Sequence, residues 1–509
     1  MNGEQLWELV ANPMVLLGLG IIAVALLVSS RSGSGSGSAK GRGPATTWAA
    51  IRTRLGYKEA VKAARRRIPE QVCPDEAQLV RKVGMWGKKW LYTQIEDSLV
   101  VIGIARSGKS RNVAIRRVRS APGSVVCSST KNDLLLACQH TTLARGTVSV
   151  YDPTGSMEGH DMTNLRQLRW DPVLGCEDPE VAIRRGSAWA SAQPMGNVKN
   201  GDWFNKRAAE LLTRLLHAAA LDGRSITDVA RWAQTLTDRA PANILEAHGR
   251  GDWADFLREL AGSRAGETVD AVKMSVGGVL APLASPRISA TLTPSRSEHF
   301  DVATFLTGKN SVFLIAPERG NATVAPVFTM LIDEILHAAS ERSQRLPGSF
   351  LWPPLTAMLD ECANIAPLPD LDGYLSDSGG RGIEITAMFQ SRDQIKKRWG
   401  PDAAGAIWKA ATMHLVLPGL RDSDLAKEME TFAGMRKVIR RSHSTGRGGS
   451  STSTSTEKEP SLPVSEVPQI PENTAWLMYR NLPILHVKLP PMPAEEIPET
   501  NHVDAVSVG

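Results

Sequence analysis

The sequence predicts an α/β fold in which a mostly parallel sheet flanked by helices is interrupted by an all-α domain and preceded by one transmembrane helix. Three observations support this prediction. Short β-branched runs alternate with helical stretches, a glycine-rich loop follows the first run, and a long helical segment separates that loop from the later strands. Of the 509 residues, 42% are hydrophobic and 22% are charged, which excludes wholesale disorder.

The N-terminal segment, residues 1–30, is expected to contain a single membrane span. Met14–Ser30 is uncharged and 17 residues long, the short end of what crosses a bilayer. No Lys or Arg precedes it, which disfavours a cleaved signal peptide, and a buried helix is the other alternative. From Arg31 to Trp90 there are 14 Lys or Arg and 4 Asp or Glu. The positive-inside rule therefore predicts a single-pass protein of the cell membrane, with its N-terminus outside and its main domains cytoplasmic.

Two further segments precede the predicted sheet. Residues 31–43 form a Gly/Ser linker by composition. Residues 44–97 form a basic juxtamembrane region, whose cluster Arg65–Arg67 is better suited to topology and anionic lipid than to specific DNA binding. The five cysteines form no CxxC pair, which favours reduced thiols over disulfides or zinc. The net charge of +6 mildly favours polyanionic partners.

The strand-like runs fall into two groups, which divide the predicted nucleotide-binding domain into residues 98–186 and residues 296–490. Buried strands are rich in β-branched residues and end in turn signals. The first group comprises Ser98–Ile104, Ser124–Cys127 and Thr147–Tyr151. The second comprises Ser311–Ala316, Leu355–Leu359, Ile383–Met388, Met413–Leu417, Trp476–Tyr479 and Ile484–Leu489.

Between these groups, residues 187–295 are expected to form the all-helical insert. Trp203–Asp222 has apolar residues at helical spacing, and Ser225–Asp228 opens the next stretch as a possible capping box. Its basic residues are expected to coat solvated helix faces: Arg207, Arg214, Arg231 and Lys273. The Ser/Thr-rich stretch at about 441–460 is expected to be a disordered loop, and residues 491–509 a Pro-rich tail.

The glycine-rich loop matches the phosphate-binding pattern G-x4-G-K-[ST] in full. Its residues are Gly103, Ile104, Ala105, Arg106, Ser107, Gly108, Lys109 and Ser110, followed by Arg111. Backbone N–H groups of such a loop surround the β-phosphate of ATP, and the following helix adds partial positive charge. Lys109 would reach the β- and γ-phosphates, and the Ser110 hydroxyl would bind Mg²⁺.

Two acids end the strand Leu355–Leu359. Asp360 would hold the Mg²⁺ shell, and Glu361 would orient and deprotonate the attacking water. Gln390 ends another apolar strand and would contact the γ-phosphate or that water, unless it is an ordinary strand cap. Lys109 and Asp360 are about 250 residues apart, far more than a few βα units require, which supports an inserted domain.

Together, these motifs resemble the TraG/TraD-type coupling proteins of conjugation and type IV secretion. The resemblance covers roughly residues 98–489 and is most specific after Asp360, in LDECANIAPLPDLDGYLSDSGGRGIEITAMFQS. It implies a RecA-like P-loop NTPase core. Two residue departures matter: Cys362 replaces the usual Phe, and Ser129-Thr130-Lys131 stands where many members have Asp-x-Lys, so Lys131 receives no role. A third departure is the single predicted membrane span, since many members of the family have at least two.

The resemblance also implies a function and a set of partners. The family forms a hexameric ATPase ring at the membrane, receives single-stranded DNA with its bound relaxase, and passes it to the secretion channel proteins. In such a ring, Arg381 would reach the γ-phosphate of a neighbouring subunit, unless it is a surface arginine in a turn. Two alternatives remain: a chromosome-partitioning double-stranded DNA translocase, and a substrate receptor that holds ATP mainly as a structural ligand. The second acid, Glu361, disfavours the receptor.

Overall fold

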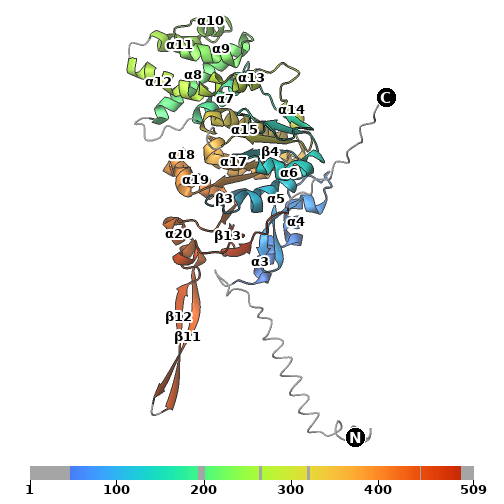
Figure 1. Cartoon of the computed structure of the whole chain (residues 1–509), viewed down its shortest axis with the longest axis vertical. Helices are drawn as coiled ribbons and strands as arrows, with labels where there is room; N and C mark the ends of the chain where they lie inside the picture. The colour runs from blue at the N-terminus through green and yellow to red at the C-terminus, as the bar shows by residue number, and fades with distance from the viewer. Residues whose placement is uncertain are drawn as a thin grey trace, which may run out of the picture.

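The computed structural model describes residues 46–70, 72–192, 201–262, 266–317, 321–446 and 449–493. Its core is a twelve-stranded sheet with helices on both faces (Figure 1). The strands in chain order are β1 (Val80–Trp86), β2 (Lys89–Gln94), β3 (Leu99–Ile102), β4 (Val125–Ser129), β5 (Val148–Tyr151), β6 (Leu165–Gln167), β7 (Ser311–Ile315), β8 (Leu355–Leu359), β9 (Ile383–Phe389), β10 (Met413–Val416), β13 (Thr474–Tyr479) and β14 (Leu485–Lys488).

The sheet combines a parallel block with an antiparallel extension, in the order β2-β1-β14-β13-β10-β3-β9-β8-β4-β7-β5-β6. The strands from β10 to β6 are all parallel, which confirms the mostly parallel sheet that the sequence predicts. Strands β13, β14, β1 and β2 extend it by antiparallel pairing. The carboxyl ends of β3, β9 and β8 therefore lie side by side at one edge.

Alternate residues of β3 face two hydrophobic clusters, because successive side chains of a strand point to opposite faces. Leu99 and Val101 pack in a cluster with α3 (Trp48–Leu55), α5 (Ile115–Arg119) and α6 (Asp133–Leu143). Val100 and Ile102 belong to the cluster that contains α15 and the insert. The remaining core helices are α4 (Tyr57–Arg65), α14 (Val302–Phe305), α15 (Asn321–Gln344), α16 (Cys362–Ile365), α17 (Leu371–Asp377), α18 (Arg392–Trp399), α19 (Pro401–Ala410) and α20 (Ser423–Ala433).

The insert is helical throughout its described part and lies at one end of the molecule (Figure 1). Its helices are α7 (Pro179–Ser191), α8 (Gly201–Leu221), α9 (Ile226–Gln234), α10 (Ala240–Ala247), α11 (Gly251–Gly262), α12 (Gly266–Leu280) and α13 (Pro286–Thr291). The capping box of Ser225 and Asp228 is present at the start of α9. The predicted boundary at residue 187 falls inside α7. This helix packs both on the insert and on α15 of the core, so it is shared by the two regions.

The region predicted as a basic juxtamembrane segment, residues 44–97, is largely part of the core domain. It forms α3, α4 and the hairpin of β1 and β2, and β1 pairs with β14 from the far end of the chain. The prediction relied on the basic composition of this region and gave no weight to its apolar residues. Among these, Ile51, Leu55 and Leu91 are fully buried.

The stretch at 441–460, predicted as a disordered loop, belongs instead to a two-stranded antiparallel ribbon, and that prediction is wrong. The ribbon consists of β11 (Met435–Gly446) and β12 (Gly449–Pro460). Met435 pairs with Pro460 at one end, and Gly446 pairs with Gly449 at the other. The ribbon projects from the end of the core opposite the insert (Figure 1). Threonine at every second position from Thr452 to Thr456 suits a strand, although the Ser-rich composition resembles disorder.

The membrane prediction concerns residues that the structure leaves undescribed. Met14–Ser30 lies before residue 46, the first described residue. Among the helices that are described, none joins the length and the apolar character needed to cross a bilayer.

Candidate nucleotide-binding site

The predicted phosphate loop connects the carboxyl end of β3 to the first helical turn before α5. Gly108 has a φ of +89°, and a Cβ there would approach the Asn112 Nδ2 atom to 2.6 Å, so the position requires glycine. The next turn, Lys109–Ala114, is wound as a π-helix. Such turns are frequent at functional sites. Ile104, Ala105, Arg106 and Arg111 are exposed.

Lys109 lies buried behind this loop. Its ammonium group donates a 2.7 Å hydrogen bond to the Gly103 carbonyl oxygen and lies 3.2 Å from a carboxylate oxygen of Glu361. The Ser107 hydroxyl oxygen, also buried, has no hydrogen-bond partner among the described residues. An unsatisfied donor beside a lysine is suited to an anionic ligand.

Asp360 meets Ser110 across the loop, as predicted for a Mg²⁺ site. The Ser110 hydroxyl donates a 3.0 Å hydrogen bond to Asp360 Oδ2. Burial, reinforced by the charge of Glu361 and opposed by Lys109, raises the pKa of Asp360 to about 6. A carboxylate and a hydroxyl are the oxygen ligands that Mg²⁺ prefers, and a bound cation would stabilise the ionised carboxylate that burial disfavours.

Glu361 is the centre of the polar contacts at this edge. Its φ of 50° is unusual for a residue other than glycine, and such backbone strain concentrates at functional sites. One carboxylate oxygen faces Lys109. The other accepts hydrogen bonds from Gln390 Nε2 at 3.0 Å and from Asn364 Nδ2 at 3.2 Å. The structure thus brings together Lys109, Glu361 and Gln390, which the sequence placed after three separate strands.

Asn364 and Gln394 complete this network, and sequence reasoning assigned them no role. Gln394 donates from Nε2 to Asn364 Oδ1 at 2.9 Å and accepts from the Gln390 backbone N–H at 2.9 Å. Asn364 stands in the quoted motif three residues after Glu361, which was an available signal. Gln394 follows the helix cap Ser391, and nothing in its position marked it.

Arg381 lies away from this network. It precedes β9, whereas Gln390 follows it, so the two residues are at opposite edges of the sheet. The Arg381 guanidinium donates a 2.6 Å hydrogen bond to Asp377 and is 31% exposed. Any role for it at a nucleotide site therefore requires a second subunit.

A buried ion cluster ties the N-terminal hairpin to the strand that carries Gln390. Glu384 of β9 pairs with Arg81 of β1 at 3.0 Å and with Arg117 of α5, and it accepts a hydrogen bond from Thr356. All four residues are essentially inaccessible to solvent. The two guanidinium groups outweigh the effect of burial and lower the pKa of Glu384. This cluster fixes α5, and with it the phosphate loop, against the sheet.

Comparisons with known proteins show which family and which structures the chain is similar to. A family model described as the TraM recognition site of TraD and TraG matches residues 354–472. The conjugal transfer protein TraG of Agrobacterium fabrum strain C58 is 23% identical over 348 residues, which cover 65% of this chain and 50% of that protein. A probable conjugal transfer protein TraG of Sinorhizobium fredii is 22% identical and covered to 51%. The chain thus matches about half the length of these relatives.

Solved structures share the fold. The bacterial conjugative coupling protein TrwBdeltaN70 superposes with a TM-score of 0.61 at 18% identity, covering 91% of this chain and 97% of that one. The plasmid coupling protein TrwB in complex with ADP and Mg²⁺ gives a TM-score of 0.60 at 17% identity, covering 90% and 97%.

Proposed function

We propose that the chain, which belongs to the TraG/TraD-type coupling proteins, is a membrane-anchored ATPase that recruits relaxase-bound single-stranded DNA and drives its transfer into a type IV secretion channel. The observation that carries this proposal is the convergence of Lys109, Gln390 and Asn364 on the carboxylate of Glu361. A structural nucleotide site has no need of a second acid held in this way.

The residues present fit ATP and Mg²⁺. The loop from Gly103 to Ser110 would hold the phosphates through its backbone N–H groups and the free Ser107 hydroxyl. Ser110 and Asp360 would hold the metal, which when bound neutralises charge on the phosphate oxygens. Lys109 is paired with Glu361, and a bound phosphate would compete for its ammonium group and release Glu361 to act on water.

Glu361 would then serve as the general base. Its two neutral amide partners, Gln390 and Asn364, orient one carboxylate oxygen without adding a charge. Gln390, at the end of the strand between β3 and β8, also stands where it would contact the attacking water or the γ-phosphate. Orienting the attacking water and accepting its proton would together give the acceleration of ATP hydrolysis expected of a general base.

The partners follow from the same proposal. The undescribed N-terminal segment would anchor the chain in the cell membrane, and six copies would form the active ring around single-stranded DNA. The insert, at the end of the core opposite the ribbon, would receive the relaxase. Binding of the purified full-length chain to relaxase–DNA, and not to relaxase-free double-stranded DNA, separates this function from that of a chromosome-partitioning translocase.

ATP turnover in the presence of single-stranded DNA tests the catalytic part. We expect DNA-stimulated hydrolysis by the wild type, and a Glu361→Gln variant that binds ATP but hydrolyses it about 10²–10⁴-fold more slowly. Lys109→Ala should lose hydrolysis and bind nucleotide weakly, because no cation then faces the phosphates. Glu259→Gln, at an exposed glutamate of α11, is the matched control and should equal the wild type.

Two results would overturn the assignment. Hydrolysis at the wild-type rate by Glu361→Gln would remove Glu361 as the base. ATP binding by the wild type without steady turnover, with DNA present, would favour the receptor in which ATP is a structural ligand.

A further inference from the structure

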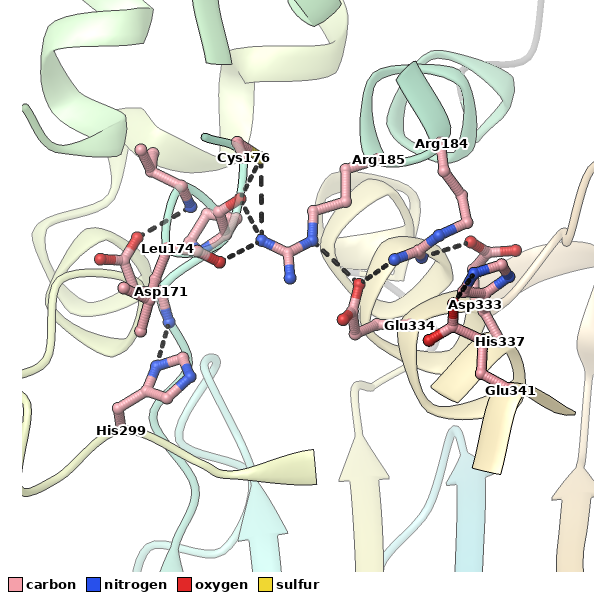
Figure 2. A network of polar contacts seen from close by, with 12 residues as sticks. Asp171, Leu174, Cys176, Arg184, Arg185, His299, Asp333, Glu334, His337 and Glu341 are labelled. Atoms are coloured by element: carbon pink, nitrogen blue, oxygen red, sulfur yellow. Dashed lines mark hydrogen bonds and ion pairs between the residues drawn. The ribbon is translucent and has the colours of Figure 1, made fainter. Parts of the chain in front are cut away.

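Among the described contacts that hold the insert to the core, two groups lie along α7. The first lies in the middle of the helix, where Arg184 and Arg185 face α15 (Figure 2). Arg184 pairs with Asp333 at 3.1 Å and with Glu334 at 2.6 Å, and Arg185 pairs with Glu334 at 2.9 Å. Although burial acts in the other direction, these guanidinium groups lower the pKa of Glu334 to about 2. This first joint is a compensated ion cluster.

The second joint is different in kind. At the carboxyl end of α7, the backbone carbonyls of Ser191 and Ala192 accept hydrogen bonds from the Arg398 guanidinium of α18. Arg398 has no acidic partner among the residues that the structure describes, and burial lowers its pKa to about 10. The partial negative charge of the helix end is thus the main compensation for this cation. The cost of burying this cation offsets what its hydrogen bonds contribute, so Arg398 adds little to stability.

Arg398 shares its helix with Gln394. The two residues are four positions apart, so their side chains lie on the same face of α18. Gln394 bonds Asn364 Oδ1 and the Gln390 N–H, and both Asn364 and Gln390 donate to Glu361. By donating from its nitrogen to Asn364 Oδ1, the Gln394 amide fixes which way the Asn364 amide points, and its oxygen holds the backbone N–H of Gln390. One short helix therefore joins the carboxylate of Glu361 to the end of α7.

We infer that α18 transmits the position of the insert to the catalytic carboxylate. Arg398 holds the helix against α7, and Gln394 holds the Asn364 amide and the Gln390 backbone in the positions from which the two amide side chains donate to Glu361. Movement of the insert, as when it binds a substrate protein, displaces Arg398 and loosens Glu361, so hydrolysis responds to the insert. Arg398 and Gln394 are positioning residues. The inference deepens the proposed ATPase function and rests on it.

The test compares Arg398→Met with Lys396→Met in the full-length chain. Methionine keeps an unbranched apolar chain similar to the aliphatic stem of the replaced residue and removes its charge and donors. Lys396 lies on the same helix, but its ammonium is exposed and pairs only with Asp393 among the described residues. We expect Arg398→Met to lower the kcat for ATP by between about twofold and thirtyfold, with KM and the melting temperature unchanged. Lys396→Met should match the wild type, and Arg398→Lys should recover part of the loss.

Hydrogen–deuterium exchange supplies a readout that does not require turnover. Arg398→Met should accelerate exchange in the peptides that contain residues 361–366 and 390–394, whereas Lys396→Met should not. Unchanged exchange there, or changes confined to residues near 191 and 398, would overturn the inference. So would a melting temperature that falls in parallel with kcat. If the wild type does not hydrolyse ATP, the proposed function fails, and the exchange result alone decides the link.

Discussion

The edge of the core sheet and the surface of the insert use charged side chains in opposite ways. At the edge, Lys109 and Glu361 are 8% and 12% exposed and meet groups from distant parts of the chain. On the insert, Arg231 and Arg258 are 59% and 39% exposed and pair with acids on their own or the next helix. Exposed pairs of that kind contribute about 0–1 kcal/mol each.

The difference shows what each region is built to do. Buried, convergent charges at the edge cost stability unless a ligand compensates them, so they indicate a site selected for chemistry. Exposed local pairs on the insert need no such compensation, because solvent screens their charges.

The largest expected effect concerns Arg381, an exposed arginine that would act in catalysis and so contradict the contrast between buried and exposed charges. By exposure and by its pairing with Asp377, it resembles the arginines of the insert, yet in a head-to-tail ring it would reach a neighbour's γ-phosphate. In that case Arg381→Ala should reduce ATP hydrolysis by about 10³–10⁵-fold without weakening nucleotide binding. Mixing this variant with Lys109→Ala should restore activity that neither shows alone, because each supplies the residue that the other lacks.

The outcome is decided by steady-state turnover of the mixture. Full DNA-stimulated activity of Arg381→Ala alone would identify Arg381 as a turn residue. Asp377→Asn removes only its partner and serves as the control.

Asp360 tests the claim that the edge costs stability. Its raised pKa means that the folded state holds a proton more tightly than the unfolded state, whose aspartate titrates near the ordinary value of 3.8. Without ligand, the wild type should therefore lose stability as the pH rises through about 6. Asp360→Asn should remove this loss and raise the free energy of unfolding at pH 8 by about 2 kcal/mol.

Denaturant unfolding at pH 5 and pH 8, with and without Mg²⁺–ATP, measures this effect. The gain should shrink at pH 5, and the variant should no longer be stabilised by Mg²⁺–ATP. A variant less stable than the wild type at pH 8 would mean that Asp360 is a structural group.

Much of this core could be predicted because each of its strands can be recognised from a short run of neighbouring residues. The runs that form β3, β8 and β9 are apolar and end in Gly103, Asp360 and Gln390, so a parallel sheet brings those residues to one edge. The extension by β1 and β14 could not be predicted, since it pairs segments from opposite ends of the chain. The role of Gln394 could not be predicted for a similar reason. Its contacts depend on how α18 packs beside Asn364, and the local sequence does not specify that packing.

The last prediction concerns two arginines of the insert that the sequence placed on the same solvated faces. Arg231 conforms, with its guanidinium exposed beside Asp228. Arg214 does not: it lies 3.9 Å from the centre of the Phe256 ring and 5.5 Å from that of Trp253, and it donates to the Glu210 carbonyl oxygen. Burial lowers the pKa of Arg214, yet stacking and alkyl packing favour the folded state.

Alanine substitution should therefore separate the two residues by a small but measurable amount. Arg214→Ala should lower the free energy of unfolding by about 1–2 kcal/mol, whereas Arg231→Ala should change it by less than about 0.5 kcal/mol. Arg214→Met, which keeps the alkyl contacts, should recover part of the loss. Neither Arg214 nor Arg231 contacts the network around Glu361, so ATP turnover per folded molecule should stay at the wild-type value. Equal losses for both alanine variants would show that the insert, like the sheet edge, depends on its charges, and the contrast between the two regions would then fail.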